Sequence, residues 1–157
     1  MCIRDRHGTL GAPAIVAPAE PPVPENVEEQ ARDMILAGRR PPIAWRPFIR
    51  SLNFRKTELA SLEPLSDLTT LTDLVLWKTK IRDISILAGL TGLQSLDMTA
   101  TQLADVTPLA RLTGLQALFL SGTRVADVVP LTGLNLSLIH IFGRVRPGRA
   151  GGAVRAV

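Results

Sequence analysis

The sequence predicts an α/β solenoid in which each coil adds one short strand to a parallel sheet and a turn to the opposite side. Four copies of one pattern run without a gap through residues 49–136 and begin at Ile49, Leu71, Leu93 and Leu115, a step of 22 residues. Leucine takes the fourth position of every copy, threonine the ninth, and aliphatic residues the eleventh, fourteenth and seventeenth. Such a period indicates units that bury their apolar face only against their neighbours.

Both ends of the chain carry a string that we expect to be non-native. Codons for residues 1–6 can be chosen so that their reverse complement encodes residues 136–141. A DNA fragment that carries a transposase sequencing adaptor at both ends has this property. The coding DNA of a natural protein is not expected to have reverse-complementary ends. We therefore assign residues 1–6 as a scar and residues 136–157 as a non-native or doubtful tail, and exclude both from the fold argument. The rest is expected to be a fragment of a longer protein.

Leaving out these two segments changes the sign of the net charge. The whole chain has 18 Lys and Arg against 14 Asp and Glu, a net charge of +4. Residues 7–135 keep 12 basic and 13 acidic residues, so their net charge is −1. A basic protein would suggest nucleic acid or an anionic membrane as partner, and we expect no nucleic-acid partner here. No apolar run reaches the ~18 residues of a membrane span.

Residues 7–24 are rich in alanine and proline, and we expect them to form an extended linker. Ala17 and Ala19 follow an apolar stretch and also fit the end of a secretory signal peptide. The linker is the interpretation that we favour. The location of the protein, at the cell surface, secreted or cytoplasmic, is left open by these residues.

Residues 25–48 are expected to form a helical N-terminal cap that covers the open end of the repeats. Asn26 and Glu29 have the spacing of a capping box at a helix start, and Gly38 would supply a left-handed stop. Apolar residues recur between them with the period of a helix, at Val27, Ala31, Met34 and Ile35.

Four further residues of this cap have two interpretations each. Arg39, Arg40 and Arg46 would form a basic patch or a solvated helix end, and we favour the solvated end. Trp45 would stack on a ligand or pack within the cap, and we favour packing.

Each of the four repeats, residues 49–135, should contain one strand. The expected strands lie near residues 51–55, 73–77, 95–99 and 117–121, with the fourth and sixth positions inward and the fifth and seventh outward. Strands one period apart must run parallel. The thirteenth position should accept a hydrogen bond in a turn, since it holds Ser61, Asp83, Asp105 and Asp127.

The apolar residues of the tail match the repeat pattern when its register is shifted by one residue. Leu136, Ile139 and Ile141 then take the first, fourth and sixth positions. We expect residues 137–142 to add a makeshift fifth strand and residues 142–157 to trail off without packing.

The repeat, shown most cleanly by Leu74, Leu76, Thr79, Ile81, Asp83 and Ile84, resembles bacterial leucine-rich repeats of the 22-residue, internalin-like type. The resemblance covers residues 49–134. It implies a leucine-rich-repeat solenoid with the parallel sheet on the concave face and short 3-10 turns on the convex face. The family commonly has asparagine at the ninth position, so the threonines here imply a ladder with weaker hydrogen bonding between repeats.

Members of this family bind proteins on the concave face, and we expect the same function here, with a protein partner of unknown identity and a monomeric chain. Trp77 should lie beside Arg55 at cation–π range, because the strands are in register. The candidate partner-binding residues are Arg55, Lys56, Val75, Trp77, Lys78, Asp97 and Phe119. For Trp77 two interpretations are equally favoured, a binding hot spot and an isolated apolar residue at the surface. For Phe119 we favour the isolated surface residue.

The sequence favours no catalytic site and no cofactor or metal. Residues 7–135 contain no cysteine and a single histidine, His7, so neither a triad nor a His/Cys metal site can be assembled. We therefore expect that the chain is not an enzyme. The alternative is that the repeats are the targeting arm of a larger enzyme or signalling protein whose catalytic domain is missing from this fragment.

Overall fold

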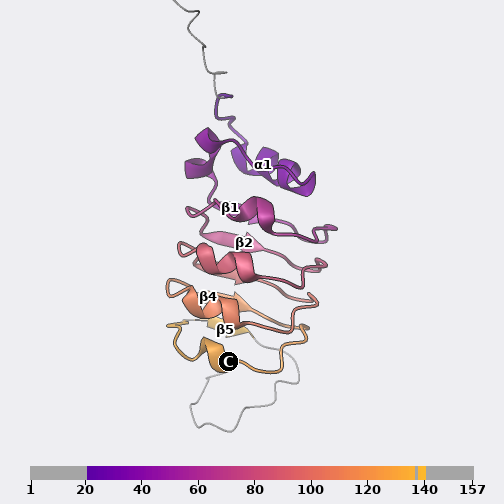
Figure 1. Ribbon diagram of the computed structural model, residues 1–157, viewed down its shortest axis with the longest axis vertical. Helices are drawn as coiled ribbons and strands as arrows, with labels where there is room; N and C mark the ends of the chain where they lie inside the picture. Colours follow the sequence, from indigo (N-terminus) through magenta and orange to yellow (C-terminus); the bar gives the residue numbers. More distant parts are fainter. Residues whose placement is uncertain (1–20, 137, 141–157) are drawn as a thin grey trace, which may run out of the picture.

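The repeats stack as successive coils, each giving one strand to a single parallel sheet (Figure 1). This computed structural model describes residues 21–136 and 138–140, the last three by their backbone alone. The strands follow the order β1-β2-β3-β4-β5 and every neighbouring pair is parallel. They are β1 (Ser51–Asn53), β2 (Asp73–Val75), β3 (Ser95–Asp97), β4 (Ala117–Phe119) and β5 (Leu138–His140). The predicted solenoid is confirmed.

Short 3-10 helices return the chain along the opposite side of the coils, as the family resemblance implied (Figure 1). They are η2 (Glu63–Leu65), η3 (Ser85–Gly89), η4 (Thr107–Arg111) and η5 (Val129–Leu131). A side-chain acceptor precedes each of them. Asp83 Oδ1 accepts from the backbone N–H of Ser85 at 2.9 Å, and Ser61, Asp105 and Asp127 make the same bond in their coils.

These bonds also lower the pKa of two carboxyl groups. The backbone N–H of Ser85, followed by its hydroxyl, lowers the pKa of Asp83. The hydroxyl of Thr107, followed by its backbone N–H, lowers the pKa of Asp105. Because these carboxyl groups have a lower pKa in the folded than in the unfolded chain, their ionisation stabilises the fold at pH values above the ordinary carboxyl pKa of about 4. This stabilisation is lost as the pH falls through their folded-state pKa values.

The register of the sheet follows the sequence period. Leu52 pairs with Leu74, Leu74 with Leu96, and Leu96 with Leu118. As predicted, the fourth and sixth positions are at most 1% exposed, at Leu52, Phe54, Leu74, Leu76, Leu96, Met98, Leu118 and Leu120. Each of these side chains therefore packs in one continuous apolar column between the sheet and the 3-10 helices.

The predicted strand ends are wrong by two positions. Each strand stops at the fifth position of its repeat, because the eighth position takes a left-handed backbone conformation, with φ of 56° at Lys56, 60° at Lys78, 57° at Ala100 and 68° at Gly122. The backbone ladder nevertheless continues, since the N–H of Lys56 donates to the carbonyl of Trp77 at 2.8 Å. The seventh and eighth positions therefore lie in a turn at the carboxyl edge of the sheet.

The threonine ladder differs from the expected one. Each ninth-position hydroxyl donates to the carbonyl three residues earlier in its own coil, as Thr79 does to Leu76 and Thr101 to Met98, both at 2.8 Å. Thr57 and Thr123 repeat this bond. A hydroxyl has one donor, so these threonines close their own turn instead of linking neighbouring repeats.

The N-terminal cap consists of α1 (Val27–Leu36) and η1 (Ile43–Phe48), which lie at the first end of the stack (Figure 1). The expected apolar helix face packs into the core, with Val27, Ala31 and Ile35 buried. Gly38 follows the helix with φ of 72°. The capping box is wrong, because the Asn26 side chain accepts from Gln30 Nε2 at 2.9 Å and makes no capping bond.

The contacts of Trp45, Arg40 and Arg46 show what these cap residues do. Trp45 is 7% exposed and its indole N–H donates to the carbonyl oxygens of Pro21 and Pro22, which confirms packing within the cap. Arg40 and Arg46 do not form a free helix end. Both lie within 3.1–3.4 Å of the Asp67 carboxylate and so connect the cap to the first repeat.

Glu28 completes the hydrogen bonding of the first coil. In the later coils, two successive N–H groups donate to one carbonyl of the preceding coil, as Thr72 and Asp73 do to Arg50. No repeat precedes β1, and there the Glu28 carboxylate oxygen Oε1 accepts from the N–H groups of Arg50 and Ser51 at 3.2 and 2.8 Å. One side-chain oxygen therefore replaces the carbonyl of a missing coil.

Glu28→Ala should lower the free energy of unfolding by about 1–2 kcal/mol, because two backbone donors at the edge of β1 lose a charged acceptor. Urea denaturation measures this change. Glu28→Gln keeps one acceptor oxygen and should cost less. Equal stability of the alanine variant and the parent would show that water replaces the carboxylate without loss.

The slipped register of the tail is confirmed for the backbone of residues 138–140. β5 pairs with β4 so that Ile139 lies opposite Leu118, one residue short of a full period. The expectations for residues 1–6, for most of the linker and for residues 142–157 fall outside the described residues.

Candidate functional site

The outward side chains of the sheet and its carboxyl edge carry the candidate site. The third and fifth positions of each repeat lie on the face of the sheet, and the seventh and eighth lie in the turn after it. We call Trp77 with the three cations around it, Arg55, Lys56 and Lys78, the Trp77 cluster. All four of its members come from the turns after β1 and β2.

Three cations surround the Trp77 ring. The Arg55 guanidinium carbon lies 4.2 Å from the ring centroid, and the ammonium groups of Lys56 and Lys78 lie at 5.2 and 5.4 Å. All three distances fall within the ~6 Å range of cation–π attraction. The predicted contact between Arg55 and Trp77 is confirmed. Lys56 and Lys78 were expected beside Trp77 as candidate binding residues, but a contact with the ring was predicted for Arg55 alone.

The burial of Trp77 supports the predicted register. Trp77 is partly buried, whereas Leu76 beside it is 0% exposed. A register shifted by one residue would have reversed these two exposures, because neighbouring strand residues point to opposite faces. Trp77 therefore points outward from the coil.

Backbone bonds hold the cluster in place. The Asn53 side chain accepts from the N–H of Arg55 at 3.0 Å, which closes the turn after β1. The N–H of Lys56 donates to the carbonyl of Trp77, and the N–H of Lys78 donates to the carbonyl of Thr99. The two turns are thus tied to each other and to the third repeat. Sequence reasoning passed over Asn53, although asparagine two residues before a turn is a known signal for this bond.

The remaining candidate residues form a row beside the cluster. Val75, Asp97 and Phe119 occupy the fifth position of neighbouring strands and pair with each other in register. All three are partly buried. Asp97 also closes its own turn, because its Oδ1 accepts from the N–H of Thr99 at 2.9 Å. The structure therefore brings the seven candidate residues onto one continuous surface, with a structural role added for Asp97.

The charges of the Trp77 cluster are not neutralised within the described residues. Lys80 pairs with Glu58, and Arg40 and Arg46 pair with Asp67. In contrast, across residues 21–136, Arg55, Lys56 and Lys78 have no carboxylate within ion-pair distance. The cluster is a local positive site at the edge of the sheet.

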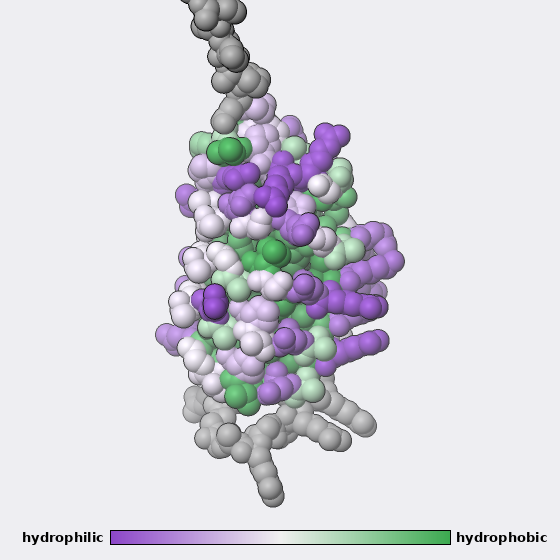
Figure 2. Space-filling view, in the orientation of Figure 1, coloured by the Kyte–Doolittle hydropathy of each residue, from purple (hydrophilic) through white to green (hydrophobic). Residues whose placement is uncertain are grey.

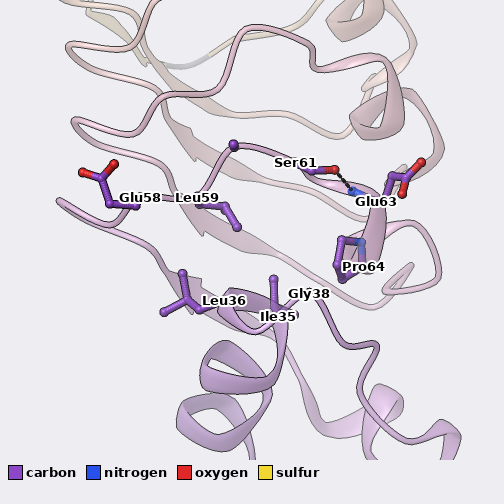
Figure 3. Close-up of a pocket in the computed structure, with 9 residues that line it drawn as sticks. Ile35, Leu36, Gly38, Glu58, Leu59, Ser61, Glu63 and Pro64 are labelled. Atoms are coloured by element: carbon purple, nitrogen blue, oxygen red, sulfur yellow. Dashed lines mark hydrogen bonds between the residues drawn. The ribbon is translucent and has the colours of Figure 1, made fainter.

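Pockets beside the cap offer no competing site. One of about 320 Å³ lies between the end of α1 and the first coil, lined by Ile35, Leu36 and Leu59 and by Glu63 (Figure 3). Another of about 440 Å³ lies beside the start of α1, where Phe48 is 57% exposed. The first pocket is also lined by Ser61, whose hydroxyl oxygen accepts from the backbone N–H of Glu63 at 3.2 Å. Phe48 follows Pro47 and lies before the first repeat, so the 22-residue pattern gave no indication of its exposure.

The described residues contain no group of three or more His, Cys, Asp or Glu side chains placed to hold a metal ion. Among the same residues, no helix is long and apolar enough to cross a membrane. In the view of Figure 2, hydrophilic side chains project from one long edge of the stack.

Comparison with known proteins places the repeats in a known class. Residues 69–111 match the family model described as leucine-rich repeats, two copies. No curated protein matches the chain.

Solved bacterial structures resemble the chain. Internalin C2 of Listeria monocytogenes is 29% identical, with a TM-score of 0.47, over 63% of this chain and 54% of that one. The functional domain of InlJ from the same organism is 21% identical, with a TM-score of 0.53, over 64% and 22%. A leucine-rich-repeat protein of Leptospira interrogans is 19% identical, with a TM-score of 0.53, over 63% and 26%.

The chain spans about half of the first of these proteins and about a quarter of the other two. The match over residues 69–111, the parallel sheet and the 3-10 turns together show that the chain has the leucine-rich-repeat fold of these bacterial structures.

Proposed function

We propose that this solenoid is a protein-interaction module and that its partner binds the concave face at the Trp77 cluster and the row of Val75, Asp97 and Phe119. The observation that carries the proposal is the partly exposed Trp77 with three cations around its ring. Tryptophan and arginine are the residues most enriched at the energetic centres of protein interfaces. A fold by itself does not establish function, so the proposal rests on this surface.

The rigidity of the surface supports the same proposal. The turns that carry the cluster are tied by backbone hydrogen bonds to the neighbouring coils, and the sheet behind them packs on a fully buried core. A surface held in this way loses little conformational entropy when a partner binds. The row of Val75, Asp97 and Phe119 lies on neighbouring parallel strands, which set its spacing at ~4.8 Å, and the turns of the cluster continue from these strands.

Trp77→Ala should weaken partner binding by about 2 kcal/mol or more while it changes thermal stability little, because the ring lies outside the core. The partner can be a peptide selected from a random displayed library on the immobilised chain, with its affinity measured by calorimetric titration. Arg111→Ala, an exposed arginine at the end of η4 on the opposite side, is the matched control and should leave the affinity unchanged.

Selected peptides that bind the Trp77→Ala variant as tightly as the parent would remove the cluster from the interface. A loss of binding with Arg111→Ala alone would move the interface to the convex side.

A further inference from the structure

We infer that the Trp77 cluster recognises an acidic protein segment, whose carboxylates dock on Arg55, Lys56 and Lys78 while Trp77 holds these cations in position. This inference rests on the proposed function and specifies the chemistry of the partner. It changes the role of Trp77 from an apolar anchor to a platform for charged donors.

The ring of Trp77 is already engaged by its own chain. The Arg55 guanidinium lies over it at 4.2 Å, and two ammonium groups approach within 5.4 Å. A partner that docks at this ring therefore meets the three cations as well as the partly exposed indole. A guanidinium stacked on an aromatic ring keeps its in-plane N–H groups free, and those groups match the two oxygens of a carboxylate.

Three positive charges at one ring need a counter-charge. Within residues 21–136 none of the three has an ion-pair partner, although residues 7–135 as a whole carry a net charge of −1. The positive charge is therefore concentrated at this edge and is not a property of the whole surface. A partner that supplies carboxylates removes the mutual repulsion of the cations.

The backbone beneath the lysines is strained. Lys56 and Lys78 hold left-handed conformations with φ of 56° and 60°, which carry an energetic cost for a residue with a Cβ. Gly122 occupies the same position of the fourth repeat and takes this conformation without that cost. Strained residues that carry functional groups are typical of binding sites. The two lysines stand at positions where glycine would fit more easily.

The surrounding acids favour a protein partner over a nucleic acid. Asp73 and Asp97 lie on the sheet face of β2 and β3, next to the cluster. A phosphodiester backbone laid along the sheet would pass these carboxylates and be repelled. A polypeptide can place its carboxylates over the cluster alone, with neutral residues over the sheet.

The strain suggests a variant that removes charge without disturbing the fold. Lys56→Gly with Lys78→Gly takes away two cations while glycine accepts the left-handed backbone. Ala100→Gly makes the same backbone change one coil further on, where φ is 57° and no charge is present. Ala100→Gly therefore controls for glycine at the left-handed position, and the double variant adds the loss of two charges at the Trp77 ring.

The probes are short labelled peptides of alternating glutamate and glycine, with glutamine or lysine in place of glutamate as references, and an oligothymidylate. Fluorescence anisotropy at low salt should show the glutamate peptide binding the full chain at least about ten-fold more tightly than the references, with affinity that falls as salt rises. The double glycine variant should bind it about ten-fold more weakly or worse, and Ala100→Gly should match the parent.

Equal binding of the glutamate peptide by the double glycine variant and the parent would overturn the inference. Tighter binding of oligothymidylate would also overturn it and assign the cluster to nucleic acid. If library-selected peptides lose affinity with Trp77→Ala but not with the double glycine variant, the partner is not acidic and the proposed function still holds. If neither variant affects any peptide, both proposals fail.

Discussion

Leu96→Ala should lower the free energy of unfolding by about 2–5 kcal/mol, the largest change expected of any single substitution proposed for this chain. Leu96 is 0% exposed at the centre of β3, with Leu74 and Leu118 opposite it in the neighbouring strands. Truncation leaves a cavity that all three coils share, and the rigid backbone ladder on both sides limits how far the coils can close it. Urea denaturation followed by circular dichroism measures the loss.

Leu36→Ala provides the control for this substitution. Leu36 is 40% exposed at the end of α1, so the same truncation creates no enclosed cavity and should cost less than about 1 kcal/mol. Equal losses at residues 36 and 96 would show that the leucines of the fourth position do not form the core that the register places there.

Gly92→Ala should lower the free energy of unfolding by about 1–3 kcal/mol, because the turn between coils has no room for a side chain. A Cβ at residue 92 would lie 2.6 Å from the backbone oxygen of Thr69 in the preceding coil. Both turns are closed by a backbone hydrogen bond, from Leu71 to Leu68 and from Leu93 to Leu90, so we expect the coils to separate to admit the methyl group. Thermal unfolding reports the change.

The corresponding glycine of the next repeat tests this explanation. A Cβ at Gly114 would lie 3.4 Å from the oxygen of Thr91, which is an ordinary contact. Gly114→Ala should therefore be close to neutral, since the smaller entropy of the unfolded chain offsets any small adjustment. If both alanine variants lose the same stability, the cause is a general need for glycine in this turn and not the close approach at residue 69.

The register of the sheet could be predicted from the sequence because the period is strict. Leucine returns every 22 residues at the fourth position, from Leu52 to Leu118, and each such residue has a single place in a stack of equal coils. The same logic predicted the contact of Arg55 with Trp77, which lie one period apart. The pairing of Ile139 with Leu118, one residue short of a period, was predicted instead from the apolar residues of the tail. Neighbours one period apart in the sequence are neighbours in space.

The ends of the strands could not be predicted in the same way. The left-handed residue that ends each of them is lysine at residues 56 and 78, alanine at residue 100 and glycine at residue 122. Only Gly122 carries a signal in its residue type. The sequence placed Lys56 and Lys78 beside Trp77, but the approach of their ammonium groups to its ring depends on the backbone of this turn and was not predicted.

The polar contacts between the cap and the first repeat lie outside any period and were not predicted. Glu28 binds the edge of β1 across 22 and 23 residues, and Arg40 reaches Asp67 across 27. The local spacing of Asn26 and Glu29 suggested a capping box, but the tertiary position of the helix directs Glu28 to the sheet and leaves Asn26 to Gln30. Local patterns predict a helix start less well when the helix end is itself a contact surface.

The two tryptophans of the chain allow a direct test of whether a partner binds at Trp77. Each indole N–H gives its own signal in a proton–nitrogen correlation spectrum. Trp45 serves as the internal reference, because its indole N–H is bonded to the Pro21 and Pro22 carbonyls inside the cap. Titration with a library-selected peptide should shift the Trp77 signal and leave that of Trp45 in place. A saturating peptide that moves the Trp45 signal and not that of Trp77 would contradict the claim and place the binding site at the cap.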